Sequence, residues 1–166
     1  MTSRIFPRRF IALAAAALIA AGASLIAAPG ASAAKADLVV YFDRTFREVI
    51  DVGTQGSSHG DITVTNGNVS KTPGGKSVGS YSTSQITASV LIPGGRENRK
   101  TDIGITVGKG VIYTTALVAA NAGTAPTSTT AHAIIGGTGR YAGVSGELVL
   151  KPVSATRYKA SFFFTD

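Results

Sequence analysis

The chain has 166 residues, of which 16 are basic and 9 acidic, and it contains neither cysteine nor tryptophan. This length suits a single domain. The absence of cysteine excludes a disulfide framework, a thiolate zinc site, an iron–sulfur centre and a cysteine nucleophile. Apolar residues make up 44% of the chain, which is too many for a disordered protein, and the glycines follow no collagen period.

The first 33 residues have the pattern of a secretory signal peptide. Three arginines among the first nine residues precede an alanine-rich apolar run that extends to Ala28, and Ala31-Ser32-Ala33 follows as a cleavage site. A run of this length could instead anchor the chain in a membrane, but its weak hydrophobicity and the cleavage site favour a leader. We therefore expect secretion, by the general or the twin-arginine route, and a mature domain of residues 34–166 without stable membrane association.

The expected mature domain carries a modest positive charge. Without the three arginines of the leader it has 13 basic and 9 acidic residues, a formal charge of +4. The basic residues are scattered, apart from the cluster Arg96-Glu97-Asn98-Arg99-Lys100, which we interpret as a solvated turn. These features favour a soluble protein that does not bind nucleic acid.

Short apolar runs separated by turn signals predict an all-β domain. No segment keeps the apolar spacing of an amphipathic helix over a dozen residues, whereas period-two alternation recurs, most clearly over residues 157–164. Turn signals include Asn66-Gly67 and Pro73-Gly74-Gly75. A short helical turn is the alternative for residues 44–50. The expected strands are 37–46, 60–66, 77–92, 101–107, 110–119, 129–136, 144–151 and 156–165.

The short connections between these strands predict antiparallel pairing, in a sandwich or a closed barrel. Eight strands can close around an interior that side chains fill or that holds one small ligand. Closure also removes the exposed strand edges that promote aggregation.

A glycine-rich stretch from Gly136 to Leu148 is the most distinctive motif. Gly137-Thr138-Gly139 is also found in nucleotide-binding loops, but those loops need a following helix inside a βαβ unit. Here an alternating strand pattern follows, and only 23 residues remain after Gly143. We therefore interpret the glycines as structural residues that permit positive φ angles and tight bends between the sixth and seventh strands. These glycines are Gly136, Gly137, Gly139 and Gly143.

The same stretch resembles the glycine signature of allene oxide cyclases and dirigent proteins, in which Gly-Gly-Ser/Thr-Gly precedes an aromatic residue, a small residue and Gly. Three other segments are similar to the first three strands of that superfamily, namely Leu38-Val39-Val40-Tyr41, Gly60-Asp61-Ile62 and Val78-Gly79-Ser80-Tyr81. The resemblance covers nearly all of residues 37–165. It implies an eight-stranded antiparallel barrel, often a homotrimer, with an apolar cavity. One branch cyclises an unstable fatty-acid epoxide, and another steers the coupling of phenoxy radicals without oxidising them.

The active residues of the cyclases are mostly not matched. Their acid after the first-strand tyrosine corresponds to Phe42, their Asn two residues further on corresponds to Arg44, and their cavity cysteine falls near Ser82. A second-strand Asn is retained as Asn66. Asp43 is one position from the expected acid, so strand alternation points it out of the cavity.

The alternation within each strand predicts which residues face the cavity. Those residues are Phe42, Arg44, Ile62, Val64, Asn66, Ser82, Ser84, Tyr158 and Phe162. His132 alternates with Ile134 and is a further candidate, as a lone acid or base. His59 is the only other histidine and is distant in sequence, so no metal site is expected. The ligand-binding candidates are therefore Phe42, Arg44, Asn66, Ser82, His132, Tyr158 and Phe162, and no catalytic residue is assigned.

Three functions remain open at this point. The favoured one is a secreted, cofactor-free, dirigent-like barrel that binds a small apolar or phenolic molecule and steers its reaction by positioning it. The second is an isomerase or cyclase, which needs an ionisable group in the cavity, and the candidates are Arg44 and His132. The third is a non-catalytic extracellular scaffold with a filled barrel. A cavity would argue against the scaffold, and an ionisable group facing that cavity would separate the cyclase from the dirigent-like protein.

Overall fold

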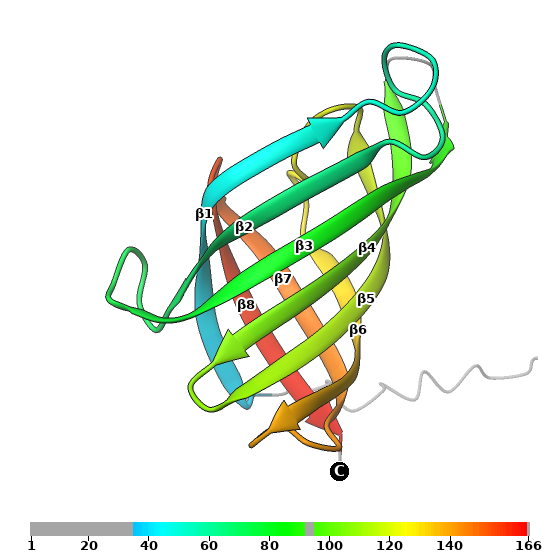
Figure 1. Ribbon diagram of the computed structural model, residues 1–166. Helices are drawn as coiled ribbons and strands as arrows, with labels where there is room; N and C mark the ends of the chain where they lie inside the picture. The colour runs from blue at the N-terminus through cyan, green and yellow to red at the C-terminus, as the bar shows by residue number, and fades with distance from the viewer. Residues whose placement is uncertain (1–34, 92–94, 166) are drawn as a thin grey trace, which may run out of the picture. The chain divides into compact units, whose positions relative to one another are not determined.

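The computed structural model describes residues 35–91 and 95–165, and the strands of this part of the chain form one closed antiparallel barrel (Figure 1). Each strand pairs with the next in sequence, and the last pairs with the first, so that Leu38 lies opposite Phe162. The predicted eight-stranded all-β barrel is confirmed. The strands are β1 (Leu38–Ile50), β2 (Ile62–Ser70), β3 (Ser77–Val90), β4 (Arg96–Val107), β5 (Gly110–Asn121), β6 (Thr130–Gly139), β7 (Ser145–Ser154) and β8 (Arg157–Thr165).

Strands β1 and β2 are longer than predicted, which corrects two interpretations. Residues 44–50 continue β1 and do not form a helical turn. Asn66-Gly67 lies inside β2, where Asn66 pairs with Phe46 on one side and with Ser82 on the other. Strand partners on both sides override the turn propensity of the dipeptide, because strand formation depends on the neighbours of a residue more than on its intrinsic preference.

The charged cluster over residues 96–100 is also not a solvated turn. It opens β4, and its alternate members Glu97 and Arg99 are only 3% and 1% exposed. They continue the inward-facing series of Thr101 and Ile103, which line the barrel interior. The turn prediction was wrong because charge alone indicated solvent, whereas the strand alternation placed every second residue inside.

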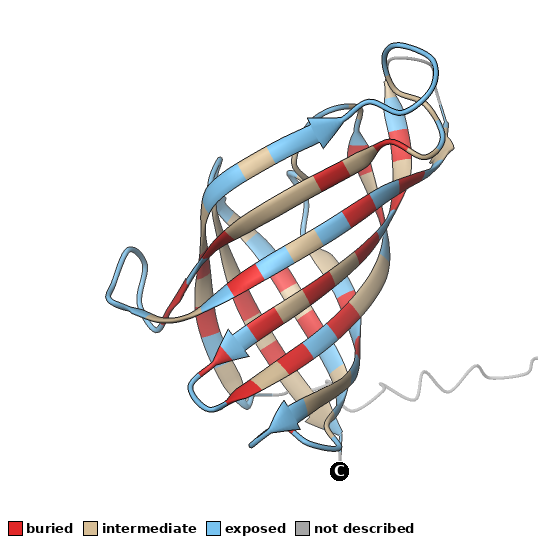
Figure 2. Ribbon diagram, in the orientation of Figure 1, coloured by how far each residue is buried: buried red, intermediate tan, exposed pale blue. Residues whose placement is uncertain are grey.

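Buried and exposed residues alternate along the strands (Figure 2), and the buried residues divide the barrel interior into two different halves. The half that contains the β4–β5 and β6–β7 turns is packed with buried apolar side chains, including Ile105, Ile112 and Leu148. The half at the opposite end of the strands is lined by buried polar residues instead. These are Thr63, Gln85, Thr87, Glu97, Arg99, Thr101, Thr114 and His132.

The glycine-rich stretch shapes the packed end of the barrel. Strand β7, and no helix, follows the glycines. Gly136, Gly139 and Gly143 have φ angles of 148°, 61° and 80°. Gly137 has no positive φ, but a Cβ there would lie 2.7 Å from the Val111 carbonyl oxygen, so close packing requires this glycine.

The predicted leader, residues 1–33, lies outside the described residues. Within the described part of the chain, no helix is long and apolar enough to cross a bilayer.

Candidate ligand-binding pocket

A pocket lies in the polar half of the barrel and opens at the end where β8 begins. Its inner part has a volume of about 60 Å³, and its outer part, about 460 Å³. One ordered water needs about 10–15 Å³ on this measure, so the inner part has room for several waters or for part of a ligand. The two parts adjoin, because both are lined by Arg44, Arg47, Ala125, Pro126 and Tyr158. The inner part is also lined by Phe42, Thr65, Tyr81, Thr83, Gln85, Thr101, Ile103, Val118, Thr130, His132 and Leu150.

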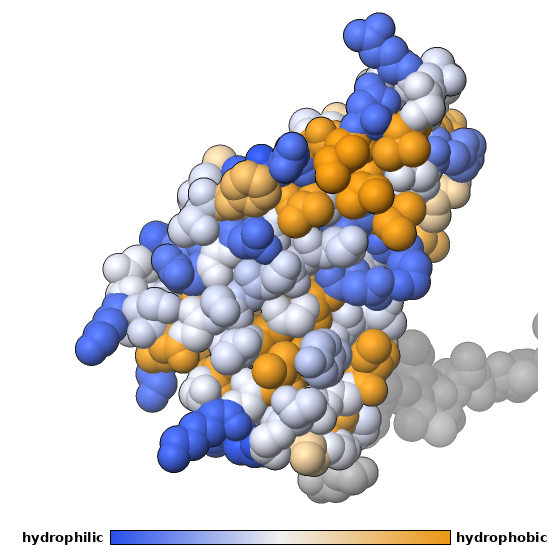
Figure 3. All heavy atoms as spheres, viewed as in Figure 1, coloured by the Kyte–Doolittle hydropathy of each residue, from blue (hydrophilic) through white to orange (hydrophobic). Residues whose placement is uncertain are grey.

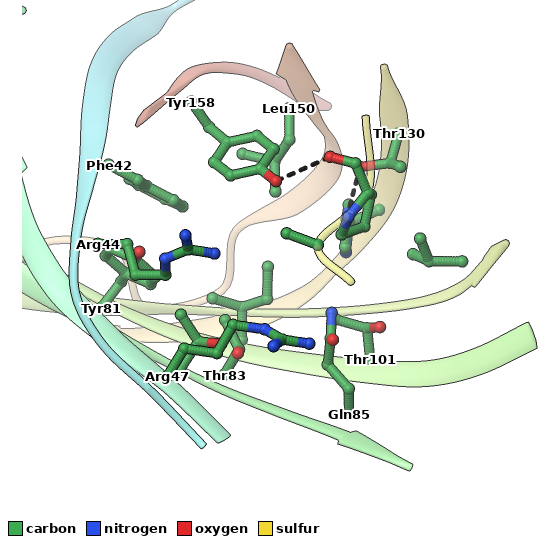
Figure 4. A pocket seen from close by; sticks show the side chains of 16 residues that line it. Phe42, Arg44, Arg47, Tyr81, Thr83, Gln85, Thr101, Thr130, Leu150 and Tyr158 are labelled. Atoms are coloured by element: carbon green, nitrogen blue, oxygen red, sulfur yellow. Dashed lines mark hydrogen bonds between the residues drawn. The ribbon is translucent and has the colours of Figure 1, made fainter. Parts of the chain in front are cut away.

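A β-bulge in β1 places two arginines on the same side of the strand. Arg44 pairs with Gly67 and Phe46 with Asn66, so Thr45 is an extra residue without its own partner on β2. Such an extra residue shifts the alternation by one position. As a result Arg44 and Arg47, which are three residues apart, both line the pocket (Figure 4).

The two guanidinium groups have few partners. Arg44 donates from Nη2 to the Ala155 carbonyl oxygen at 3.0 Å. Arg47 Nη2 is buried and has no hydrogen-bond partner among the described residues. Burial, and then the neighbouring positive charges of Arg99 and Arg44, lower the pKa of Arg47. No carboxylate is among the lining residues described, so the pocket carries net positive charge.

Aromatic side chains form the boundary between the pocket and the packed core. The rings of Phe42 and Tyr81 stack with centroids 4.6 Å apart and planes 15° from parallel. Burial raises the pKa of Tyr81 to about 12, and it also raises the pKa of Tyr158. The Tyr158 hydroxyl donates to the Pro126 carbonyl oxygen at 2.8 Å, which ties the β5–β6 loop to β8 at the pocket mouth (Figure 4).

His132 supplies a neutral polar group to the inner pocket. The residue is 2% exposed, and its Nε2 lies 3.1 Å from the Thr130 hydroxyl. Its Nδ1 is buried without a hydrogen-bond partner among the described residues, as is the hydroxyl of Thr83. Burial lowers the pKa of His132 to about 4, so the ring is uncharged at neutral pH. Together with Arg47, these residues place three buried polar atoms without partners among the residues that line the pocket.

A buried ion pair lies in the polar half of the barrel, next to the pocket. Arg99 pairs with Glu97, which also accepts a hydrogen bond from the Ser57 hydroxyl. The Arg99 guanidinium donates to the carbonyl oxygens of Thr124 at 2.6 Å and Asn121 at 3.0 Å. The pair therefore fixes the start of the β5–β6 loop, whose later residues lie at the pocket mouth.

The predicted ligand-binding residues fall into three groups, of which two face the barrel interior and the third, Asn66 and Ser82, does not. Phe42, Arg44, His132 and Tyr158 line the pocket. Phe162 faces the interior but is fully buried in the apolar core, outside the pocket lining. Asp43 lies outside the lining, as alternation predicts, and pairs with Arg157.

The prediction that Asn66 and Ser82 face the cavity was wrong. They lie opposite each other in the β2–β3 register and line a shallow groove on the outside of the barrel. The register pairs Phe42 with Val69, so the odd-numbered residues of β2 face inward. For the same reason Ile62, Val64 and Ser84 also lie on the outer face, opposite in orientation to the prediction.

The apolar residues on the outer surface explain why the alternation in β2 predicted the wrong inward face. Ile62 pairs with Ile50 on one side and Ile86 on the other, and these two neighbours are 44% and 43% exposed. An apolar patch is visible over this region of the surface (Figure 3). In this part of β2 and β3, apolar residues such as Ile62 and Ile86 lie outside and polar residues such as Thr63 lie inside, which reverses the pattern of a soluble barrel with a packed core.

Several pocket residues were not predicted. Arg47 could not be placed without knowledge of the bulge at Thr45. Tyr81, Thr83 and Gln85 follow once the register of β3 is known, and Thr101 belongs to an alternation with Ile103 that the sequence does show. No group of three or more His, Asp or Glu side chains that could hold a metal ion occurs in residues 35–91 and 95–165.

Comparisons with known proteins agree on the barrel. No protein-family model and no curated protein sequence matches the chain. A solved structure of pyocyanin demethylase is similar, with 22% identity and a TM-score of 0.62 over 77% of this chain and 98% of that one. A pterocarpan synthase dirigent protein has 14% identity and a TM-score of 0.51, over 74% and 80% of the two chains. A Diels–Alderase from Streptomyces koyangensis has 14% identity and a TM-score of 0.55, over 79% and 68%. The chain therefore has a dirigent-like barrel fold, and the resemblance seen in the sequence is confirmed at the level of the fold.

Burial of His132 predicts an acid-sensitive fold. The unfolded histidine binds a proton near pH 6.5, whereas the folded one does so only near pH 4. Above pH 6.5 this histidine is neutral in both the folded and the unfolded state. As the pH falls from 6.5 towards 4, the unfolded state binds a proton that the folded state does not, so the free energy of unfolding decreases. We expect the free energy of unfolding, measured in urea, to decrease by about 2 kcal/mol between pH 7.5 and pH 5. His132→Gln should reduce that loss, and His59→Gln, which changes an exposed residue, should not. An unchanged pH dependence in His132→Gln would contradict the prediction.

Proposed function

We propose that the protein binds a small apolar or aromatic molecule inside its barrel and steers the reaction of that molecule by holding it in one conformation. The observation that carries this proposal is the pocket itself. Aromatic and aliphatic side chains line its inner part beside polar ones, and three of the lining residues carry a buried polar atom without a partner among the described residues. Buried polar atoms are nearly always hydrogen-bonded, so these atoms indicate a ligand or ordered water. A barrel that served only as a scaffold would need neither the space nor these atoms.

The structural neighbours support a reaction inside such a barrel. They are named as a demethylase, a pterocarpan synthase and a Diels–Alderase. Positioning alone can supply a large part of a rate enhancement when the reacting atoms of one molecule are held in contact. The pocket of this chain has the parts for positioning, since flat aromatic surfaces lie beside directional polar groups.

A cyclase or isomerase is the second candidate, and one observation favours it. Both Arg44 and His132 are ionisable and both line the pocket. Because Phe42 stands where the cyclases have an acid, we expect no appreciable cyclisation of a fatty-acid epoxide. A turnover assay on an allylic epoxide tests this. Chiral product formed faster than in buffer, and lost in Arg44→Gln or His132→Gln, would favour the cyclase.

Binding can be tested by filling the pocket from one strand. The chain has no tryptophan, so the fluorescence of N-phenyl-1-naphthylamine, a neutral aromatic probe, can be followed without interference. We expect saturable binding, weakened at least about tenfold by Thr83→Phe, which occupies the inner pocket. Ser84→Phe is the matched control, because the next residue of β3 points to the outside. Equal binding by both variants would place the probe on the surface and contradict the proposal.

We also propose that the protein acts outside the cell after removal of its leader. The charged start, the apolar run and Ala31-Ser32-Ala33 support this proposal. Mass spectrometry of the culture medium should find a chain that begins within a few residues of Ala34. Recovery of only the full-length chain, bound to membranes, would contradict it.

A further inference from the structure

The pocket holds more positive charge than the nearby acidic residues neutralise. Arg44 and Arg47 line it, and no aspartate or glutamate is among its described lining residues. The nearest acids are occupied elsewhere. Glu97 pairs with Arg99, and Asp43 pairs with Arg157 away from the lining.

The other acidic groups of the pocket cannot supply the missing negative charge. Burial raises the pKa of both Tyr81 and Tyr158, so their phenols remain neutral at pH 7. Burying an unpaired charge is costly. Arg47 nonetheless has a buried Nη2 without a hydrogen-bond partner among the described residues. A guanidinium group favours planar or multi-oxygen anions, to which it donates two parallel hydrogen bonds.

The two arginines lie where the inner and the outer part of the pocket meet. Arg44 and Arg47 line both the inner and the outer part, whereas Phe42, Tyr81 and Leu150 line only the inner part. A ligand that reaches the inner part with its ring would therefore keep one end beside the arginines.

We propose that the ligand is an aromatic or other apolar molecule with one anionic group. The ring or chain lies in the inner pocket against Phe42 and Tyr81, and the anionic group lies between the guanidinium groups of Arg44 and Arg47. This inference rests on the proposed function and adds to it the chemical class of the ligand. The anionic group is a carboxylate or a sulfonate, each of which presents at least two oxygen acceptors to the two arginines.

A matched pair of fluorescent probes tests the inference. 8-Anilinonaphthalene-1-sulfonate and N-phenyl-1-naphthylamine share one ring system and differ by the sulfonate group. We expect the wild-type protein to bind the sulfonate at least about tenfold more tightly, the usual effect of hydrogen bonds to a charged group. Arg47→Gln, and the double variant Arg44→Gln/Arg47→Gln, should lose this preference, so that the affinities of each variant for the two probes lie within about threefold of one another.

Arg140→Gln is the control for overall charge. Arg140 is exposed in the turn after β6, at the opposite end of the barrel, and its replacement removes one positive charge without touching the pocket. This variant should keep the preference for the sulfonate. Equal wild-type affinity for the two probes, or the same loss of preference in Arg140→Gln, would overturn the inference while leaving the proposed function intact. If neither probe binds the wild-type protein, the proposed function itself fails. The wild-type comparison does not depend on the folding of any variant.

Discussion

Arg99→Met is expected to destabilise the barrel by about 3–5 kcal/mol, the usual cost of removing one partner from a buried ion pair. The side chains of Arg99 and Glu97 are 1% and 4% exposed, so the remaining carboxylate would stay buried without its partner. The same change also removes the hydrogen bonds to Thr124 and Asn121 that fix the β5–β6 loop.

Lys100→Met is the matched control for this experiment. Lys100 is the next residue of β4, faces outward and pairs with Asp102, and the two side chains are 58% and 49% exposed. An exposed pair of this kind contributes less than about 1 kcal/mol. Unfolding in urea at pH 7 measures the free energy of unfolding of each variant. In the double variant Glu97→Met/Arg99→Met we expect part of the stability to return, because no buried charge remains unpaired. Equal losses for Arg99→Met and Lys100→Met would contradict the prediction.

Gly139→Val is expected to prevent folding or to lower the melting temperature far more than the same change at Gly143. Both glycines have positive φ, at 61° and 80°, so valine is strained at either position. That strain alone costs on the order of 1–2 kcal/mol. At Gly139 a Cβ would also collide with the Lys109 carbonyl oxygen and lie 3.1 Å from the Gly110 Cα, whereas at Gly143 nothing lies within 4 Å.

Thermal unfolding of the two variants separates these effects. Gly143→Val should unfold several degrees below the wild type, which corresponds to strain alone. Gly139→Val should unfold much lower or accumulate as insoluble protein, because backbone atoms cannot move aside as a flexible side chain can. An unchanged melting curve for Gly139→Val, with loss of a measurable nucleotide affinity, would restore the nucleotide-loop interpretation of the motif.

The sequence was sufficient for the fold because each element carried its own local signal. Alternation over residues 157–164 and the glycines at the end of β6 and in the turn after it identify strands and bends without knowledge of their partners. The closed barrel then follows from the number of strands and their short connections.

The pocket could be predicted only in part, because its residues depend on register. On β1 and β8 the large aromatic residues Phe42 and Tyr158 face inward, so hydrophobicity gave the correct face. On β2 the interior positions are Thr63 and Thr65, and the apolar Ile62 lies outside, so the same argument gave the wrong face. The bulge at Thr45 depends on strand pairing, which no local pattern encodes. The buried pair of β4 continues the alternation of Thr101 and Ile103, but its charges indicated solvent.

The pairing of β1 with β8 also determines when the barrel can form during synthesis. Leu38 at the start of β1 lies opposite Phe162, so the first strand made must wait for the last one before it gains its second partner. Contacts between such distant residues make folding slow, because the entropy of a long loop is lost before the contacts form. Until β8 arrives, β1 and β7 are open edges that can pair with other chains. A chain released without β8 therefore has no closed state to reach. If the chain is exported before it folds, its two ends meet for the first time on the far side of the membrane.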